Sequence, residues 1–108
     1  MTQQKAMPTI FYADTKAQAV FGKTGPQPRF LLDSEPFQAL VVGLEAGQKI
    51  PVHPESAALY HILEGSGTMT VDRQTFALQP GATIIALDGA ERGMQADTRL
   101  IFLATKAG

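Results

Sequence analysis

The stretch GQKIPVHPESAALYHILEG, residues 47–65, decides the fold of this chain. It reads as a strand, a short turn and a second strand, with His53 at the turn. Further along the chain come the turn PGA at residues 80–82 and the segment LDGAERG at residues 87–93. Proline and glycine at these places favour tight turns between short strands. The centre of the sequence therefore predicts β-structure and not helix.

The same pattern of short strands extends from residue 29 to the end of the chain. Clusters rich in Gly, Pro, Asp and Ser separate apolar segments of four to nine residues. The predicted strands are 29–33, 37–45, 49–53, 58–63, 67–71, 75–78, 83–87, 93–96 and 99–104. Evenly spaced short strands of this kind indicate an all-β sandwich or barrel. We expect residues 29–108 to form one barrel domain.

Residues 1–28 have a different composition and are predicted to be an N-terminal arm and loop. The segment GKTGPQP, residues 22–28, contains two glycines and two prolines and is typical of a loop. Residues 13–20 are compatible with a short helical turn that has Asp14 as its N-cap.

Composition excludes several classes of protein. The chain has 108 residues, 44% of them hydrophobic and 18% charged, with a net charge of −1. This composition is typical of a globular domain. A net charge so close to zero predicts no basic surface that could bind nucleic acids or acidic lipids. The chain has no cysteine, which excludes disulfides and thiolate metal sites. The N-terminal MTQQKAMPTIF lacks the apolar core of a signal peptide, and the apolar runs are too short to cross a bilayer. We expect a cytoplasmic protein with no membrane or nucleic-acid partner.

Four short motifs, taken together, resemble the two conserved motifs of the cupin family. Gly47 is followed after five residues by His53, and LEGSG stands at residues 63–67. LQPG occupies residues 78–81, and LDGAER, residues 87–92, takes the place of the second motif's end. The resemblance covers roughly residues 37–105. It implies an all-β jelly-roll barrel of the cupin type, the double-stranded β-helix, in a single domain.

The resemblance also implies a metal centre, because cupins usually hold a metal on three histidines and a glutamate. Here only His53 occupies a histidine position. Glu55 stands where the second histidine belongs, Ala58 replaces the glutamate and Arg92 replaces the last histidine. If the metal site were kept, its ligands would be His53, Glu55 and His61. Alternation along the strand argues against His61, because Ala58 and its even-numbered neighbours would face inward and His61 outward unless a bulge reversed them.

Arg92 is the residue that most strongly disfavours a metal of the family type. A permanent cation at a ligand position would repel a buried divalent ion. The sequence leaves three roles open for Arg92. Its guanidinium could form an ion pair with Glu55, it could bind the carboxylate or phosphate of a small ligand, or it could lie beside a metal.

We therefore favour a degenerate cupin that binds a small polar or anionic molecule without a metal of the family type, as a sensor or accessory protein. His53, Glu55, Tyr60 and Arg92 would line the mouth of its barrel. One alternative is a metal-dependent oxygenase or isomerase with Fe, Mn, Ni or Zn on His53, Glu55 and His61. A second alternative is a structural protein that acts only through its dimer surface.

A homodimer is the expected assembly. The segments at residues 37–44 and 100–103 are nearly continuous apolar runs, as in strands that are covered on both faces. A small barrel covers only the inner face of its strands by itself, so the outer face would pack on a second copy.

Overall fold

Nine strands and one short 3₁₀ helix make up residues 9–107, the part of the chain that the computed structural model describes. In chain order they are η1 (Lys16–Gln18), β1 (Gln27–Asp33), β2 (Phe37–Leu44), β3 (Lys49–Pro54), β4 (Ala58–Glu64), β5 (Gly67–Val71), β6 (Gln74–Leu78), β7 (Thr83–Ala86), β8 (Glu91–Ala96) and β9 (Leu100–Ala107). Each predicted strand is present, which confirms the all-β prediction. The clearest differences are that β1 and β8 each begin two residues earlier than predicted and β9 continues three residues further. Gln27 and Pro28, predicted to end the N-terminal loop, therefore belong to a strand because they pair with Gly43 and Val42 of β2.

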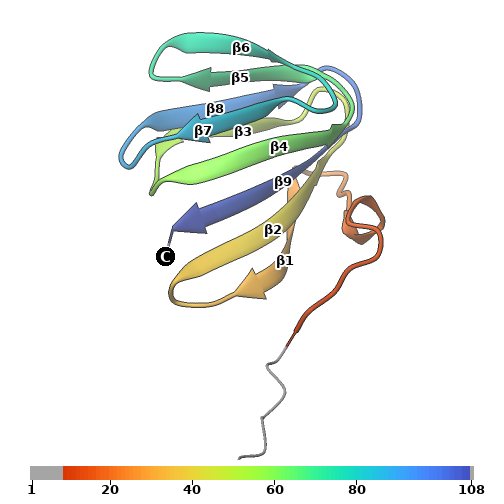
Figure 1. Cartoon of the computed structure of the whole chain (residues 1–108). Coiled ribbons are helices and arrows are strands. Elements are labelled where there is room, and N and C mark those ends of the chain that lie inside the picture. Colours follow the sequence, from red (N-terminus) through yellow and green to blue (C-terminus); the bar gives the residue numbers. More distant parts are fainter. Residues whose placement is uncertain (1–8, 108) are drawn as a thin grey trace, which may run out of the picture.

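The strands form two antiparallel sheets that face each other (Figure 1). One sheet has five strands in the order β1-β2-β9-β4-β7, and the other has four in the order β3-β8-β5-β6. Chain neighbours such as β3 and β4 lie in different sheets, so the polypeptide crosses repeatedly between the two layers. This is the jelly-roll arrangement that the resemblance implied.

Strand alternation places the core between the sheets. Along β4, Ala58, Tyr60 and Ile62 are buried, whereas the residues between them are only partly buried. The rings of Tyr60 and Phe102 pack at a tilt of 56°, with their centroids 5.8 Å apart. Leu44 and Leu100 are fully buried at one end of this core. Burial of apolar side chains on both inner faces is the main contribution to stability in a fold of this type.

One turn requires glycine. Gly65, between β4 and β5, has a φ of +85°, and a β-carbon at this position would lie 2.0 Å from the carbonyl oxygen of Arg99. An L-residue would therefore meet both backbone strain and a collision with main-chain atoms. The glycine of the LEGSG motif thus has a structural role in the close approach of two loops.

The N-terminal segment covers part of the outer face of the five-stranded sheet. A β-carbon on Gly43 would lie 2.4 Å from the carbonyl oxygen of Val20 and 3.0 Å from the Phe21 ring, so this segment packs directly on β2. The guanidinium of Arg99 stacks on the Phe21 ring, 3.6 Å from its centroid. Val41, which faces outward beside Gly43, is fully buried. A second copy is therefore not needed to cover this end of the sheet. Only the part of the outer face that the N-terminal segment leaves uncovered could form a dimer contact.

The predicted helical turn is shorter than residues 13–20. The 3₁₀ helix spans three residues, and its N-cap is Thr15 and not Asp14. The Asp14 carboxylate nevertheless accepts a hydrogen bond of 3.4 Å from the Ala17 backbone N–H, so it stabilises the start of the turn. Residues 1–8 of the predicted arm lie outside the described residues. Across residues 9–107 the structure contains no helix with the length and apolar character needed to cross a bilayer.

Candidate functional site

A cavity of about 310 Å³ lies inside the barrel, between the two sheets. This volume is at the lower end of the range typical of small-molecule sites, roughly 300–1,000 Å³. Most of the lining is apolar, and the polar side chains are His53, Glu55, Tyr60, Arg92, Lys106 and Lys49. The apolar side chains include Leu40, Val42, Ile50, Met69, Met94 and Phe102. The arrangement suits a small ligand that has an apolar body and a polar group.

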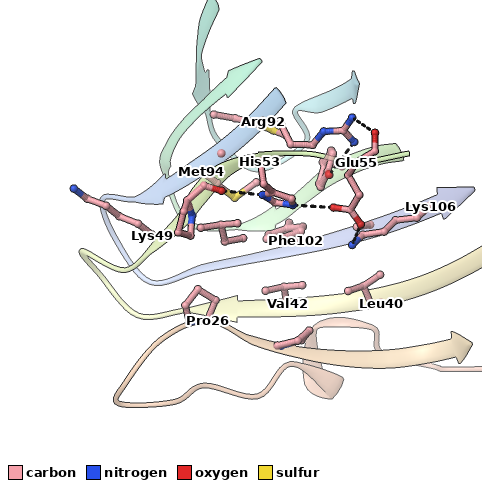
Figure 2. A pocket seen from close by; sticks show the side chains of 17 residues that line it. Pro26, Leu40, Val42, Lys49, His53, Glu55, Arg92, Met94, Phe102 and Lys106 are labelled. Carbon is pink, nitrogen blue, oxygen red and sulfur yellow. Dashed lines mark hydrogen bonds and ion pairs between the residues drawn. The ribbon is translucent and has the colours of Figure 1, made fainter. Parts of the chain in front are cut away.

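His53, Glu55 and Lys106 form a row of interacting side chains in the cavity wall, which Figure 2 shows opposite Leu40 and Val42. His53 is near the end of β3, and Glu55 follows directly after that strand. One oxygen of the Glu55 carboxylate lies 2.9 Å from His53 Nε2, and the other accepts a short hydrogen bond from Lys106 Nζ. The loop after β3 therefore meets the end of β9 through one carboxylate shared by two nitrogen groups.

Both ring nitrogens of His53 face oxygen atoms. Nδ1 lies 2.8 Å from the carbonyl oxygen of Pro51, and Nε2 faces the Glu55 carboxylate. Burial raises the pKa of Glu55, but hydrogen bonds and charges from Lys106 and His53 outweigh burial, and the net pKa is lowered from 4.5. Glu55 is therefore ionised near neutral pH, and its carboxylate lies between the Lys106 ammonium and the His53 ring.

Arg92 is 1% exposed and projects from β8 into the same end of the barrel. Nε and Nη2 donate to the Ala90 carbonyl at 3.0 and 2.9 Å, and Nη2 also reaches the carbonyls of Glu55 and Leu87 at 3.0 Å. Nη1 donates to the Ser56 carbonyl at 2.7 Å and, at 3.4 Å, to the Tyr60 hydroxyl. All acceptors are uncharged. The guanidinium thus connects the loop between β3 and β4 to the loop between β7 and β8.

This geometry corrects the expected ion pair between Arg92 and Glu55. Arg92 contacts the backbone carbonyl of Glu55, while the carboxylate turns to His53 and Lys106. The physical reason is that each charged group bonds to the partners that lie within hydrogen-bond distance of it. The carbonyls of two loops and the Tyr60 hydroxyl surround the guanidinium and accept its hydrogen bonds, and Lys106 approaches the carboxylate from β9. The predicted pocket residues His53, Glu55, Tyr60 and Arg92 do line one cavity.

His61 lies on the other face of β4, as alternation predicts. Its Nδ1 is 2.7 Å from the hydroxyl of Thr83, on the neighbouring strand β7 and at the exposed surface. It therefore cannot join His53 and Glu55, and the three-ligand set of the enzyme alternative does not come together.

The residues present do not fit a metal of the cupin type. A site for a divalent transition metal needs three or more nitrogen or oxygen ligands. Among residues 9–107 no group of three or more His, Asp or Glu side chains is arranged to hold a metal. The two candidates that meet, His53 and Glu55, hydrogen-bond to each other, and the last motif position carries the charge of Arg92. The metal-dependent alternative is therefore disfavoured by its donor set.

Lys106 is the functional candidate that sequence reasoning missed. The predicted strand ended at residue 104, whereas β9 continues to Ala107. Alternation from Phe102 and Ala104 turns Lys106 to the inner face, where it lines the cavity. Had the alternating pattern been extended by two residues, a lysine on the inner face would have been predicted.

Comparison with solved structures identifies the fold. A cupin superfamily protein from Desulfitobacterium hafniense is similar over 98% of each chain, with a TM-score of 0.82 and 17% identity. A double-stranded β-helix protein from Klebsiella pneumoniae has a TM-score of 0.82 and 18% identity, over 93% of this chain and 90% of that one. An RmlC-like cupin from Shewanella frigidimarina has a TM-score of 0.74 and 19% identity, over 77% and 76%. No protein-family model and no curated protein matches the sequence. The structural likenesses show that the chain has the cupin fold, as its motifs indicated.

Proposed function

We propose that this chain of the cupin fold is a small-molecule-binding protein that holds a polar or anionic ligand in its barrel without a metal. The observation that carries the proposal is the cavity of about 310 Å³, apolar over most of its wall and polar at one end. A few polar groups that converge on an apolar pocket are typical of ligand sites. The cavity also argues against the purely structural alternative, in which side chains would fill the barrel.

The four predicted pocket residues have different parts in this proposal. His53, Glu55 and Tyr60 offer polar groups to a ligand, since all three line the cavity. Arg92 uses its donors on the protein, so it shapes the mouth of the barrel and adds positive charge instead of holding the ligand itself. Binding, and not catalysis, is the activity that this arrangement supports.

The test is a thermal-shift screen of the purified protein against a metabolite collection, combined with elemental analysis. A ligand that binds the folded state raises the melting temperature, and the increase grows with the ratio of ligand concentration to Kd. Ala104→Met should block the cavity, because Ala104 lies in its lining. Thr70→Met is the matched control, since Thr70 adjoins the cavity-lining Met69 on β5 but faces outward. The proposal fails if no compound stabilises the protein, or if a stoichiometric transition metal is lost on His53→Ala.

We also propose that the protein is a cytoplasmic homodimer. The outer face of the five-stranded sheet has a shallow groove lined by Phe37, Leu59, Ile85 and Thr105. Phe37 is 45% exposed and Ile85 63% exposed, and an apolar surface of this kind favours contact with a second copy. Sedimentation equilibrium should give a dimer for the wild type and a monomer for Ile85→Glu. Val52→Glu, which adds the same charge on β3 of the other sheet, should remain dimeric.

A further inference from the structure

We infer that the ligand is a small monocarboxylate with an apolar body and that Lys106 anchors its carboxylate. This inference rests on the proposed function and names the class of molecule that the site selects. It follows from three features of the cavity: its charge, its unused hydrogen-bond donors and its apolar wall.

The polar end of the cavity has an excess of positive charge. Lys106 and Arg92 are cations, and Glu55 is the anion beside them. The two oxygens of Glu55 are used by Lys106 and His53, so this carboxylate does not neutralise Arg92. Within residues 9–107 the guanidinium bonds only to carbonyl and hydroxyl oxygens, although it is 1% exposed. A buried cation compensated only by dipoles favours one further negative charge nearby.

Two side chains have donors left to offer to that charge. The Lys106 ammonium has three N–H donors, and Glu55 uses one of them. The Tyr60 hydroxyl accepts from Arg92 and keeps its own O–H for a ligand. On the adjacent strands β4 and β9, Tyr60 pairs with Ala104, two residues from Lys106 and on the same face. Such diagonal neighbours are close enough for long side chains to act on one group, so the two oxygens of a carboxylate can be shared between them.

The apolar part of the cavity wall determines the chemical character of the rest of the ligand. Leu40, Val42, Met69, Met94 and Phe102 offer no hydrogen bonds and require an apolar body. A second charge on the ligand would be buried among these side chains without a partner, which disfavours dicarboxylates. An amine would be repelled by Lys106 and Arg92. The cavity therefore selects a compact acid with a single charge.

The experiment compares acids with their neutral and cationic analogues by titration calorimetry and ligand-observed NMR. The probes are benzoate, 3-phenylpropionate and hexanoate, each with the corresponding primary amide and amine. At least one acid should bind about tenfold or more tightly than its amide, the difference expected for a hydrogen bond to a charged group. The corresponding amine should not bind. Equal affinity for acid and amide, or binding of neutral compounds only, overturns the inference and leaves the proposed function standing. If no compound of this set or of the metabolite collection binds, both fail.

Lys106→Met tests the anchor. It keeps an unbranched apolar side chain but removes the ammonium, and it should weaken binding of the acid about tenfold or more and abolish the preference for acid over amide. Lys23→Met is the matched control, because Lys23 is an exposed lysine outside the cavity lining, so the variant makes the same substitution and removes the same charge away from the site. The double variant Lys106→Met with Glu55→Gln separates direct contact from repulsion by an unpaired Glu55. If this double variant regains the preference for the acid, Lys106 is not the anchor.

Discussion

Replacing Arg92 by methionine tests how the end of the barrel is held together. The guanidinium is the hydrogen-bond donor for the carbonyls of Ser56 and Ala90, which accept no other hydrogen bond in the described part of the chain. The Glu55 and Leu87 carbonyls keep the backbone N–H groups of Gly89 and Ala90 as partners. Methionine preserves most of the buried apolar stem but donates nothing. The variant therefore leaves two carbonyls without a donor.

The expected loss follows from these two groups. A fully buried acceptor without a partner costs about 1–3 kcal/mol, and Ser56 and Ala90 are only half-buried, so the two carbonyls together cost at most about 6 kcal/mol. Removing a buried cation offsets part of this loss of stability, because the charge no longer has to be transferred out of water on folding. We expect Arg92→Met to lower the free energy of unfolding by about 2–4 kcal/mol. For a domain of this size the melting temperature should fall by at least about 8 °C.

Urea unfolding followed by far-ultraviolet circular dichroism measures this loss, with all variants at one protein concentration. Arg29→Met is the control, because Arg29 is an exposed arginine on β1 and lies outside the two loops that Arg92 connects. The control should lose less than about 1 kcal/mol. An Arg92→Met protein as stable as the control would refute the idea that these carbonyls depend on the guanidinium. Hydrogen exchange of the Gly89 amide gives a second readout, since its bond to the Glu55 carbonyl should open more often in the variant.

Three further predictions concern single side chains. The pKa of Glu55 is lowered in the folded protein, so the stabilising effect of its carboxylate is fully present above about pH 4.5 and is lost as the pH falls through the folded-state pKa. In acid denaturation curves, the stability difference between wild type and Glu55→Gln should therefore shrink over that range. A constant difference would contradict the assigned contacts. Gly65→Ala should lower the free energy of unfolding in urea by about 2–4 kcal/mol, because the effects of backbone strain and of overlap with the Arg99 carbonyl add. Gly81 is also at positive φ but has open space around it, so Gly81→Ala should lower the free energy of unfolding by only about 1 kcal/mol. Equal losses would show that the overlap is relieved by movement. His61→Ala should leave ligand affinity unchanged in calorimetry, since His61 faces away from the cavity, and a change of threefold or more would place it in the site.

The element pattern was predictable because it depends on local chemistry. Turn-forming residues such as those at 64–67 and 79–81 interrupt β-forming segments at regular intervals, and each predicted strand is present. Alternation correctly assigned His61 to the outer face, because side-chain direction in a regular strand follows from position alone. The strand ends were less predictable, since contacts with the neighbouring strands extend β8 and β9 beyond their most apolar residues.

The partners of the charged residues were not predictable from local pattern. An ion pair with Glu55 was one of three roles left open for Arg92, but the Glu55 carboxylate contacts Lys106 and His53 instead. The N-terminal segment likewise covers outer-face residues that had been assigned to a dimer contact. Both outcomes depend on segments that are distant in sequence and adjacent in space.

By itself, then, the sequence determined the barrel, the inward and outward faces of its strands, and the loss of the cupin ligands. Only the tertiary structure decided that backbone carbonyls surround Arg92 and that Glu55 is held between His53 and Lys106. The physical reason is that strand formation follows from each segment's own side chains, whereas a buried charge takes whichever donors or acceptors the packed loops bring within hydrogen-bond distance.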